Sequence, residues 1–167
     1  TGGAGYCGSR LVPQLLSSGY KVTVYDIMYF GSDFLPVQNP NLNIIVGDIR
    51  DTEKLYESSK GHDFFVSLAC ISNDASFELD EKLSTSVNLH GFEPMVLTAK
   101  KSGVKRFIFI SSIKVNGEMT KKQPFSVDDV PAPSDPYGIT KMEAEFEITR
   151  AAKGTGMSTV ILRPPLV

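Results

Sequence analysis

The hydrophobic positions along this chain repeat with two periods, and their alternation predicts an α/β fold. Short, almost continuously apolar runs indicate buried strands, and longer segments with apolar residues every three or four positions indicate helices. Strands of this kind are typical of a parallel sheet that helices cover on both faces. The predicted strands are 21–26, 43–46, 63–69, 105–111 and 157–162, and the predicted helices are 8–18, 52–59, 79–102 and 137–153.

Proline and glycine set the limits of the two longest predicted helices. Gly103 marks the end of the helix over 79–102, and Pro94 is expected to bend it, because proline lacks an N–H and its ring crowds the preceding turn. Pro136 suits the first turn of the last helix. Residues 117–134 are rich in Pro, Asp and Ser and show no period, so we expect a functional loop there.

Length and composition fit one domain with a hydrophobic core. The chain has 167 residues, of which 41% are hydrophobic, and a net charge of −2 at pH 7. That charge gives no reason to expect nucleic acid or an anionic membrane as a partner, and no apolar run reaches the roughly 18 residues that span a bilayer. Cys7 and Cys70 lack metal-ligand spacing, so we expect no metal site and no disulfide framework. No secretory signal is visible, and we expect a cytoplasmic location.

Glycines recur every third residue at the start of the chain, at Gly2, Gly5 and Gly8. Residues without Cβ allow a tight turn and a close approach of the backbone to a ligand. The helix that follows offers free N–H groups and the positive end of its dipole to a pyrophosphate. Asp26 ends the next predicted strand, where a carboxylate can accept both ribose hydroxyls of NAD and repels the extra phosphate of NADP. The pattern therefore predicts an NAD site.

Two further strand ends are expected to border the same cofactor. Asp48 and Ile49 follow the strand over 43–46. A short acid there can accept a hydrogen bond from the adenine amino group, and its apolar neighbour can lie against the ring. The alternative for Asp48 is a capping residue in front of the helix over 52–59. The backbone of 68–70, at the end of the next strand, is expected to pass the cofactor.

Tyr137 and Lys141 are four residues apart, so they lie on one face of the predicted helix. A phenol titrates at about pH 10, and a nearby ammonium and a nicotinium charge would lower its pKa. Tyr137 would then accept the proton of a sugar hydroxyl while hydride leaves to the nicotinamide. Lys141 can also bond the nicotinamide ribose, and Ser112, at a strand end, can orient the substrate oxygen. The alternative is an ordinary Tyr/Lys pair on a helix surface.

Five segments, in this order, resemble the extended short-chain dehydrogenase/reductase family, the NAD-dependent epimerase/dehydratase group that acts on nucleotide sugars. They are T-G-G-A-G-Y-C-G, G-D-I-R-D, S-L-A-C, F-I-S-S-I-K-V-N-G and D-P-Y-G-I-T-K-M-E-A-E, and the resemblance covers essentially the whole chain. It implies a doubly wound Rossmann fold, tightly bound NAD and catalysis by Ser112, Tyr137 and Lys141. It also implies a homodimer through the helices over 79–102 and 137–153.

The resemblance further indicates that residues 1–167 are a partial NAD-binding Rossmann domain. Thr1 stands almost on the glycine loop, so we expect the first strand of the sheet to be lacking, together with the family's smaller C-terminal substrate domain. Arg163–Pro165 resembles the strand end near the carboxamide, and Asn88 matches the family's helix asparagine. The expected cofactor-binding residues are Gly2, Gly5, Tyr6, Cys7, Gly8, Asp26, Asp48, Ile49, Leu68, Ala69, Cys70, Asn88, Ser111, Tyr137, Lys141 and Pro164.

Departures from the family pattern narrow the expected reaction. The family's sugar 4,6-dehydratases and decarboxylases carry one or two acidic residues after the strand-end Ser or Thr, where this chain has Ile113 and Lys114. Elimination between C5 and C6 needs an acid and a base near those carbons, so dehydration is disfavoured. We therefore expect a nucleotide-sugar epimerase that acts at C4 of a hexose through a transient 4-keto intermediate.

Two other functions stay open from the sequence. One is a 4-keto reductase or dehydrogenase that exchanges its cofactor with solvent, and the other is a non-catalytic protein that senses the dinucleotide on the same fold. The retained catalytic residues argue against the second. Turn chemistry is the alternative explanation for Ser72 and Asn73. The expected substrate-binding residues are Ser72, Asn73, Ser112, Lys114 and Tyr137.

Overall fold

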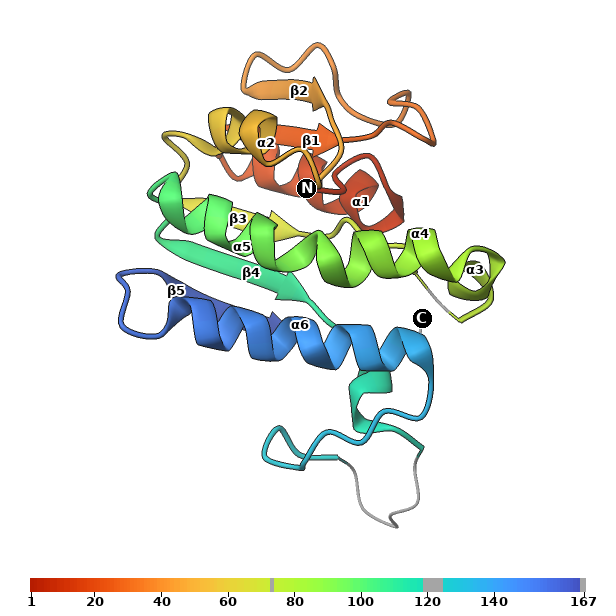
Figure 1. The fold of residues 1–167 in the computed structure, drawn as a ribbon. Helices are drawn as coiled ribbons and strands as arrows, with labels where there is room; N and C mark the ends of the chain where they lie inside the picture. Colours follow the sequence, from red (N-terminus) through yellow and green to blue (C-terminus); the bar gives the residue numbers. More distant parts are fainter. Residues whose placement is uncertain (73, 119–124, 166–167) are drawn as a thin grey trace.

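The computed structural model describes residues 1–72, 74–118 and 125–165, which form two parallel sheets (Figure 1). All pairings among these residues are parallel. The predicted α/β fold is confirmed, and every predicted strand is present with ends that differ by one or two residues. One sheet pairs β1 (Val22–Asp26) with β2 (Leu42–Val46), and the other has the order β3 (Phe64–Ser67), β4 (Arg106–Ile110), β5 (Ser158–Leu162).

The first residues of the chain connect the two sheets. The main-chain nitrogen of Thr1 donates to the carbonyl of Val66 at 2.7 Å, and the N–H of Leu68 donates to the carbonyl of Thr1 at 3.1 Å. On the other side, the N–H of Gly2 donates to the carbonyl of Tyr25 at 3.1 Å. Thr1 and Gly2 thus lie between β1 and β3, at the place of the first strand that we expected the chain to lack. They place the glycine loop at the middle of the molecule.

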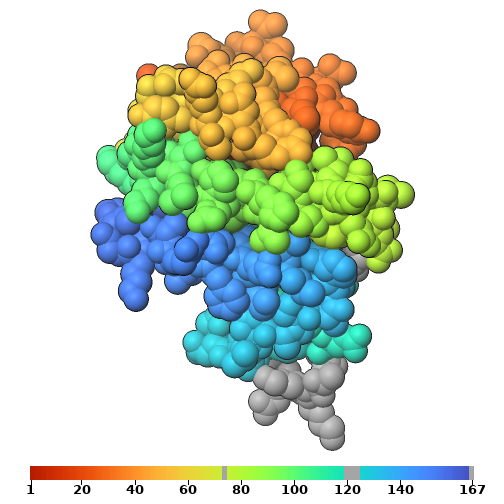
Figure 2. Space-filling model, viewed as in Figure 1, coloured from red at the N-terminus to blue at the C-terminus, as the bar shows by residue number. Residues whose placement is uncertain are grey.

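Helices cover both faces of the sheets (Figure 1). α1 (Tyr6–Ser17) packs against β1 from one face, while α2 (Thr52–Ser59), α5 (Phe92–Lys101) and α6 (Pro136–Ala152) lie side by side on the other. Figure 2 shows the outer side of this second layer, where the side chains of the three helices form one continuous surface. Cover on both faces explains why the strands are apolar along their length.

Two hydrophobic cores lie on the two faces of the sheets. The larger is centred on Phe107, which is fully buried and stacks on Phe65 with 5.0 Å between ring centroids, and it reaches α5 through Met95. The smaller packs α1 onto β1 around Val24. Val24 and its neighbour Tyr25 belong to different cores, because successive side chains of a strand point to opposite faces.

The single helix predicted over 79–102 is wrong. The structure has α3 (Asp74–Leu79), α4 (Glu81–Thr85), the π-helical turn η1 (Ser86–His90) and then α5. The last three follow one another in nearly one line (Figure 1). The side chain of Asp80 caps α4, which separates it from α3. The N–H of Gly91 donates to the carbonyl of Ser86, five residues earlier, and this longer spacing defines the π turn.

Pro94 does not bend a helix, which corrects a second prediction. It is the third residue of α5, directly after the π turn η1, and α4, η1 and α5 follow one another in nearly one line (Figure 1).

The other predicted helices are confirmed with small shifts at their ends. α1 begins two residues before its predicted start and contains Pro13, and α6 begins with Pro136 in its first turn. The described part of the loop predicted over 117–134 contains no helix or strand, and residues 119–124 of it lie outside the description. A short 3-10 helix, η2 (Ile113–Asn116), precedes it. Within the described ranges, no helix is long and apolar enough to cross a bilayer.

Candidate active site

The glycine loop forms the first part of the candidate site, and two of its glycines are required by the fold itself. Gly2 has a φ of +73°, and a Cβ there would lie 2.4 Å from the main-chain nitrogen of Ala69. A Cβ on Gly8 would lie 2.3 Å from the carbonyl oxygen of Gly3. A Cβ on Gly5, in contrast, would meet only the carbonyl oxygen of Gly2, at an ordinary contact distance of 3.4 Å. Packing within the protein therefore does not explain the glycine at position 5.

A ligand at the start of α1 does explain it. Gly5 is the N-cap residue of α1, so no N-cap side chain accepts a hydrogen bond from the first-turn N–H groups. These N–H groups, with the positive end of the helix dipole, suit a pyrophosphate that approaches the backbone closely. Tyr6 and Cys7 extend their side chains into solvent at the same helix start. The loop thus fits the pyrophosphate of NAD.

Asp26 ends β1 and braces the glycine loop. One carboxylate oxygen accepts a hydrogen bond from the N–H of Ala4 at 3.0 Å, and the other accepts from the N–H of Met28 at 2.8 Å. A carboxylate oxygen can accept more than one hydrogen bond, so ribose hydroxyls can bind the same group. The role of Asp26 in ribose binding stays a prediction.

Asp48 is paired with Arg50. Its Oδ1 accepts from the main-chain N–H and the Nε of Arg50, each at 2.9 Å, and its Oδ2 accepts from Nη2 at 2.5 Å. These hydrogen bonds lower the pKa of Asp48. Arg50 also donates to the Ser86 hydroxyl at 2.7 Å, so the pair ties the end of β2 to the π turn. The cap of α2 is Asp51 rather than Asp48.

Ile49 was predicted to lie against the adenine ring. Its side chain is instead buried in the larger hydrophobic core. A side chain already enclosed by protein offers little surface to a base, so this contact is disfavoured. The adenine contact of Asp48 stays a prediction, and it would compete with Arg50.

Asn88 lies on the π turn and fixes the chain that follows β3. Its amide N–H donates to the carbonyl of Ile71 at 2.8 Å, and its amide oxygen accepts from the N–H of Ile71 at 2.9 Å. π turns inside helices often occur at functional sites, because they redirect a side chain. Beside this contact is a small pocket, in which four predicted site residues meet. It is lined by Ala69, Cys70, Asn88, Phe92, Phe109 and Lys141.

Tyr137 and Lys141 are buried in the first two turns of α6. The Lys141 ammonium donates to the carbonyl of Ile110 at 3.0 Å. It lies 5.6 Å from the centroid of the Tyr137 ring and 4.8 Å from that of Phe109. The two residues therefore share one helix face, as their spacing predicts, and that face meets the carboxyl end of β4.

Ser112 follows β4 and is also buried. Its hydroxyl oxygen accepts a hydrogen bond from the N–H of Lys114 at 3.2 Å, which starts η2. A hydroxyl that accepts through one lone pair can still donate its proton to a substrate oxygen. The geometry is therefore compatible with the predicted role of Ser112.

The start of α6 is held against η2. Asp135 caps the helix by accepting from the N–H of Gly138 at 2.7 Å, and it also forms an ion pair with Lys114 at 3.3 Å. A Cβ on Gly138 would lie 2.9 Å from the carbonyl oxygen of Lys114, so the two segments touch through their backbones. These contacts fix the first turn of the helix that carries Tyr137.

A buried polar network, missed by the sequence prediction, lies next to these residues. The Glu145 carboxylate accepts from the Ser111 hydroxyl at 2.5 Å and pairs with the Arg163 guanidinium at 2.6 Å. Arg163 also donates to the side-chain oxygen of Asn116 at 3.0 Å. The hydrogen bonds from Arg163 to Glu145 raise the pKa of Arg163. The available signal was the position of Glu145, one helical turn beyond Lys141 on the same face.

The remaining predicted residues lie at the borders of the site. The hydroxyl of Ser111, expected to bind the cofactor, donates to Glu145 instead. Ser72 is exposed beyond β3, and Asn73 lies outside the described residues. The carbonyl of Pro164 accepts from the N–H of Ile113 at 3.1 Å, beyond the last strand pairing. Their ligand contacts stay predictions.

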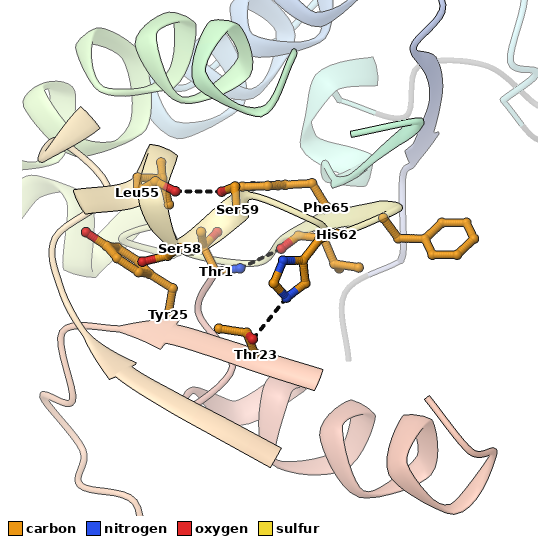
Figure 3. Close-up of a pocket in the computed structure, with 10 residues that line it drawn as sticks. Thr1, Thr23, Tyr25, Leu55, Ser58, Ser59, His62 and Phe65 are labelled. Atoms are coloured by element: carbon orange, nitrogen blue, oxygen red, sulfur yellow. Dashed lines mark hydrogen bonds between the residues drawn. The ribbon is translucent and has the colours of Figure 1, made fainter. Parts of the chain in front are cut away.

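A second pocket lies between β1 and β3, at the amino ends of the strands (Figure 3). His62 crosses it. Its Nδ1 lies 3.1 Å from the carbonyl of Lys60 and must donate there, so in the neutral ring its Nε2 accepts from the Thr23 hydroxyl at 2.9 Å. None of the predicted site residues lines this pocket, so it is not the candidate active site.

Known proteins resemble this chain over its whole length. The model of the NAD dependent epimerase/dehydratase family matches residues 1–167. The chain belongs to the NAD-dependent epimerase/dehydratase family. NAD is its cofactor, and the resemblance drawn from the five motifs is confirmed.

Among curated relatives, this epimerase/dehydratase family member is 37% identical over 171 residues to a UDP-glucose 4-epimerase of Vibrio cholerae, covering 100% of this chain and 50% of the relative. It is 32% identical over 152 residues to the sterol-4-alpha-carboxylate 3-dehydrogenase, decarboxylating, of Bos taurus, covering 90% and 40%. The chain spans half or less of the length of these two relatives.

Among solved structures, the chain is similar to a double mutant of the dTDP-glucose 4,6-dehydratase of Streptomyces venezuelae with NAD bound. The TM-score is 0.89 at 27% identity, and the match covers 97% of this chain and 53% of the other. This similarity confirms the Rossmann-type fold. The proteins that this chain resembles therefore include enzymes that differ in reaction.

Proposed function

We propose that the full-length protein is a nucleotide-sugar epimerase that inverts C4 of a hexose through a transient 4-keto intermediate. The observation that carries the proposal is the position of Lys141, which lies 5.6 Å from the Tyr137 ring, donates to the carbonyl of Ile110 two residues before Ser112, and lines the small pocket. The 4-epimerase activity named for the Vibrio cholerae relative supports it.

The chain's own residues supply the proton chemistry of this reaction. NAD, when bound, provides a reversible acceptor for the hydride of C4. Tyr137 would accept the proton of the C4 hydroxyl as a phenolate, a form that the ammonium of Lys141 favours. Ser112 would donate a hydrogen bond to the same sugar oxygen and hold it. Once the 4-keto sugar has turned its other face to the nicotinamide, the hydride would return to C4. The same groups would then return the proton to the C4 oxygen.

The residues after Ser112 favour epimerisation over dehydration. Ile113 and Lys114 begin η2, and the Lys114 ammonium is paired with Asp135. Neither side chain supplies the carboxylic acid that elimination requires. We include Lys114, Ser72 and Asn73 as substrate contacts in this proposal.

The second candidate is a 4-keto reductase or dehydrogenase, which the sterol dehydrogenase relative favours. The test uses full-length protein purified without added cofactor and a panel of UDP-, GDP- and dTDP-hexoses, with C4 configuration followed by NMR. Interconversion without added nicotinamide would support the epimerase. Turnover only after NAD(P)H and a 4-keto sugar are supplied would favour the reductase, and no turnover in either case would favour a dinucleotide sensor.

A homodimer, a C-terminal substrate domain and a cytoplasmic location complete the proposal. The first two rest on the family resemblance, and the third is the expectation stated from the sequence. For the dimer, α5 and α6 expose Leu97, Ile139 and Phe146 to solvent, and the last two are seven residues apart on one helix stripe. Phe146→Glu is expected to shift the full-length protein from dimer to monomer in sedimentation velocity. Val127→Glu, at an exposed loop position, serves as control. A Phe146→Glu protein that stays dimeric would reject this interface.

A further inference from the structure

The ion pair of buried Glu145 with partly buried Arg163 is bonded to the segments on both sides of Ser112. Glu145 lies on α6, and Arg163 directly follows β5. Ser111, which donates to Glu145 at 2.5 Å, is the residue before Ser112. Asn116, which accepts from Arg163 at 3.0 Å, is the last residue of η2. One ion pair therefore joins α6, the helix of the proposed catalytic residues, to the carboxyl ends of β4 and β5 and to η2.

The geometry of the pair suits orientation better than it suits stability. A buried ion pair contributes little net stability, because desolvation of both charges offsets their attraction. Its carboxylate and guanidinium are planar, however, and their hydrogen bonds have fixed directions. The Glu145 carboxylate is 7% exposed as a residue and receives the Ser111 hydroxyl, the Arg163 Nε at 2.9 and 3.2 Å, and the Arg163 Nη2 at 2.6 Å.

We propose that Glu145 and Arg163 are positioning residues, which hold the Ser112 strand end in register with the Tyr137 and Lys141 face of α6. The inference rests on the proposed function. Ser111 connects the pair to the reaction. Ser112, the next residue, has an extended backbone with φ −154° and ψ 151°. Fixing the Ser111 hydroxyl on Glu145 therefore also fixes the backbone position from which the Ser112 side chain extends.

The proposal predicts a loss of rate without a loss of cofactor. Reaction rates depend steeply on the placement of reacting groups, and a shift of about 1 Å can cost on the order of 100-fold. The glycine loop and Asp26 make no hydrogen bond to the pair among the described contacts. Binding of NAD should then be kept while hydride transfer slows.

The experiment compares Ser111→Ala and Glu145→Gln with the wild type in the full-length protein. The rate of hydride transfer from a saturating nucleotide hexose to bound NAD is followed in single turnovers by NADH absorbance. Half-saturating substrate concentration, NAD content and hydrogen exchange of residues 111–116 are measured alongside. Glu57→Gln is the matched control, since Glu57 pairs with Lys60 at 2.6 Å on the exposed side of α2.

We expect hydride transfer to fall roughly tenfold in Ser111→Ala and on the order of 100-fold in Glu145→Gln. NAD content and half-saturation should stay within about twofold of wild type, and exchange at 111–116 should be faster. Glu57→Gln should match the wild type. A wild-type rate in Ser111→Ala would overturn the proposal, as would a rate loss that only follows the loss of bound NAD.

Two safeguards keep the result decisive. Glu145→Gln leaves the partly buried Arg163 charge without its counter-charge, so if that variant does not fold, Ser111→Ala decides the question alone. A wild type that reduces bound NAD without inverting C4 would reject the epimerase and leave the positioning test intact. A wild type that transfers no hydride to NAD from any hexose of the panel would overturn both.

Discussion

The two ends of the candidate site are built from different parts of the chain. At the glycine loop the decisive atoms belong to the backbone, since a Cβ on Gly2 or Gly8 would lie 2.4 or 2.3 Å from main-chain atoms. At the α6 end the decisive atoms belong to buried polar side chains, with Lys141 on a carbonyl and Glu145 on Arg163. The cofactor end should therefore be damaged by added atoms, and the catalytic end by removed ones.

The largest effect is expected from removing one oxygen at the catalytic end. Tyr137→Phe should lower the rate of hydride transfer by roughly 1,000-fold, because a positioned acid or base contributes about 100- to 10,000-fold. NAD content should change little, since the variant keeps the aromatic ring that lies 5.6 Å from the Lys141 ammonium. Single-turnover NADH absorbance of the full-length protein measures the effect.

Tyr20→Phe is the matched control for this substitution, because Tyr20 is half exposed and packs edge-on against Phe64 at the amino end of β3. It should retain the wild-type rate. Near-normal turnover in Tyr137→Phe would remove the catalytic assignment of Tyr137.

A smaller effect is expected from adding one carbon at the cofactor end. Gly5→Ala should fold, because its Cβ meets only one oxygen at 3.4 Å. It should nevertheless weaken NAD binding by at least about tenfold, or about 1.4 kcal/mol, since the methyl group would occupy the approach to the start of α1. Calorimetric titration of cofactor-depleted full-length protein measures the affinity.

Gly156→Ala controls for the substitution itself, since its Cβ would meet nothing within 4 Å. If Gly5→Ala and Gly156→Ala bound NAD equally well, the pyrophosphate would not approach the chain at position 5, and this half of the comparison would fail.

The same contrast explains what could be predicted from the sequence. The strands, the glycine loop and the Tyr137–Lys141 face depend on residues close together in the chain, so local patterns reveal them. The Glu145 network joins residues 34, 18 and 47 positions apart, and no local period marks such partners. Each of these residues also has an ordinary reading on its own, as a surface acid, a strand-end base or a turn amide.

The break before α5 was missed for a related physical reason. The π turn adds one residue to a helical turn, yet α4, η1 and α5 still follow one another in nearly one line (Figure 1), so the chain continues as a helix past the interruption. The interruption becomes visible only through Asn88, whose amide reaches Ile71 after a different strand. The irregularity lies at residues 86–91, before Pro94, and not at Pro94 itself.

A third prediction separates charge from capping at the start of α6. Asp135→Ala should lower the free energy of unfolding by about 1 kcal/mol, because it removes the hydrogen bond to the N–H of Gly138. Asp135→Asn keeps a capping oxygen and loses only the ion pair with Lys114, so it should cost less than half as much. Urea unfolding of the full-length protein measures both, and equal losses would show that charge dominates over capping.

The smallest effect contrasts two buried tyrosines. Burial, reinforced by the charges of Asp51 and Asp48, raises the pKa of Tyr25 to about 12, whereas Tyr137 faces an ammonium. Because the folded-state pKa is the higher one, the stabilising contribution of the Tyr25 phenol is fully present below about pH 10 and is lost as pH rises through about 12. Tyr25→Phe removes the hydrogen bond to the Asp48 carbonyl and should lower the free energy of unfolding by about 1 kcal/mol at neutral pH.

An alkaline titration of phenolate absorbance, taken as wild type minus Tyr25→Phe, should show one group titrating at about pH 12. A difference curve centred near the ordinary value of about 10 would mean that Tyr25 is solvated, and that β1 is less tightly packed than its 3% exposure implies.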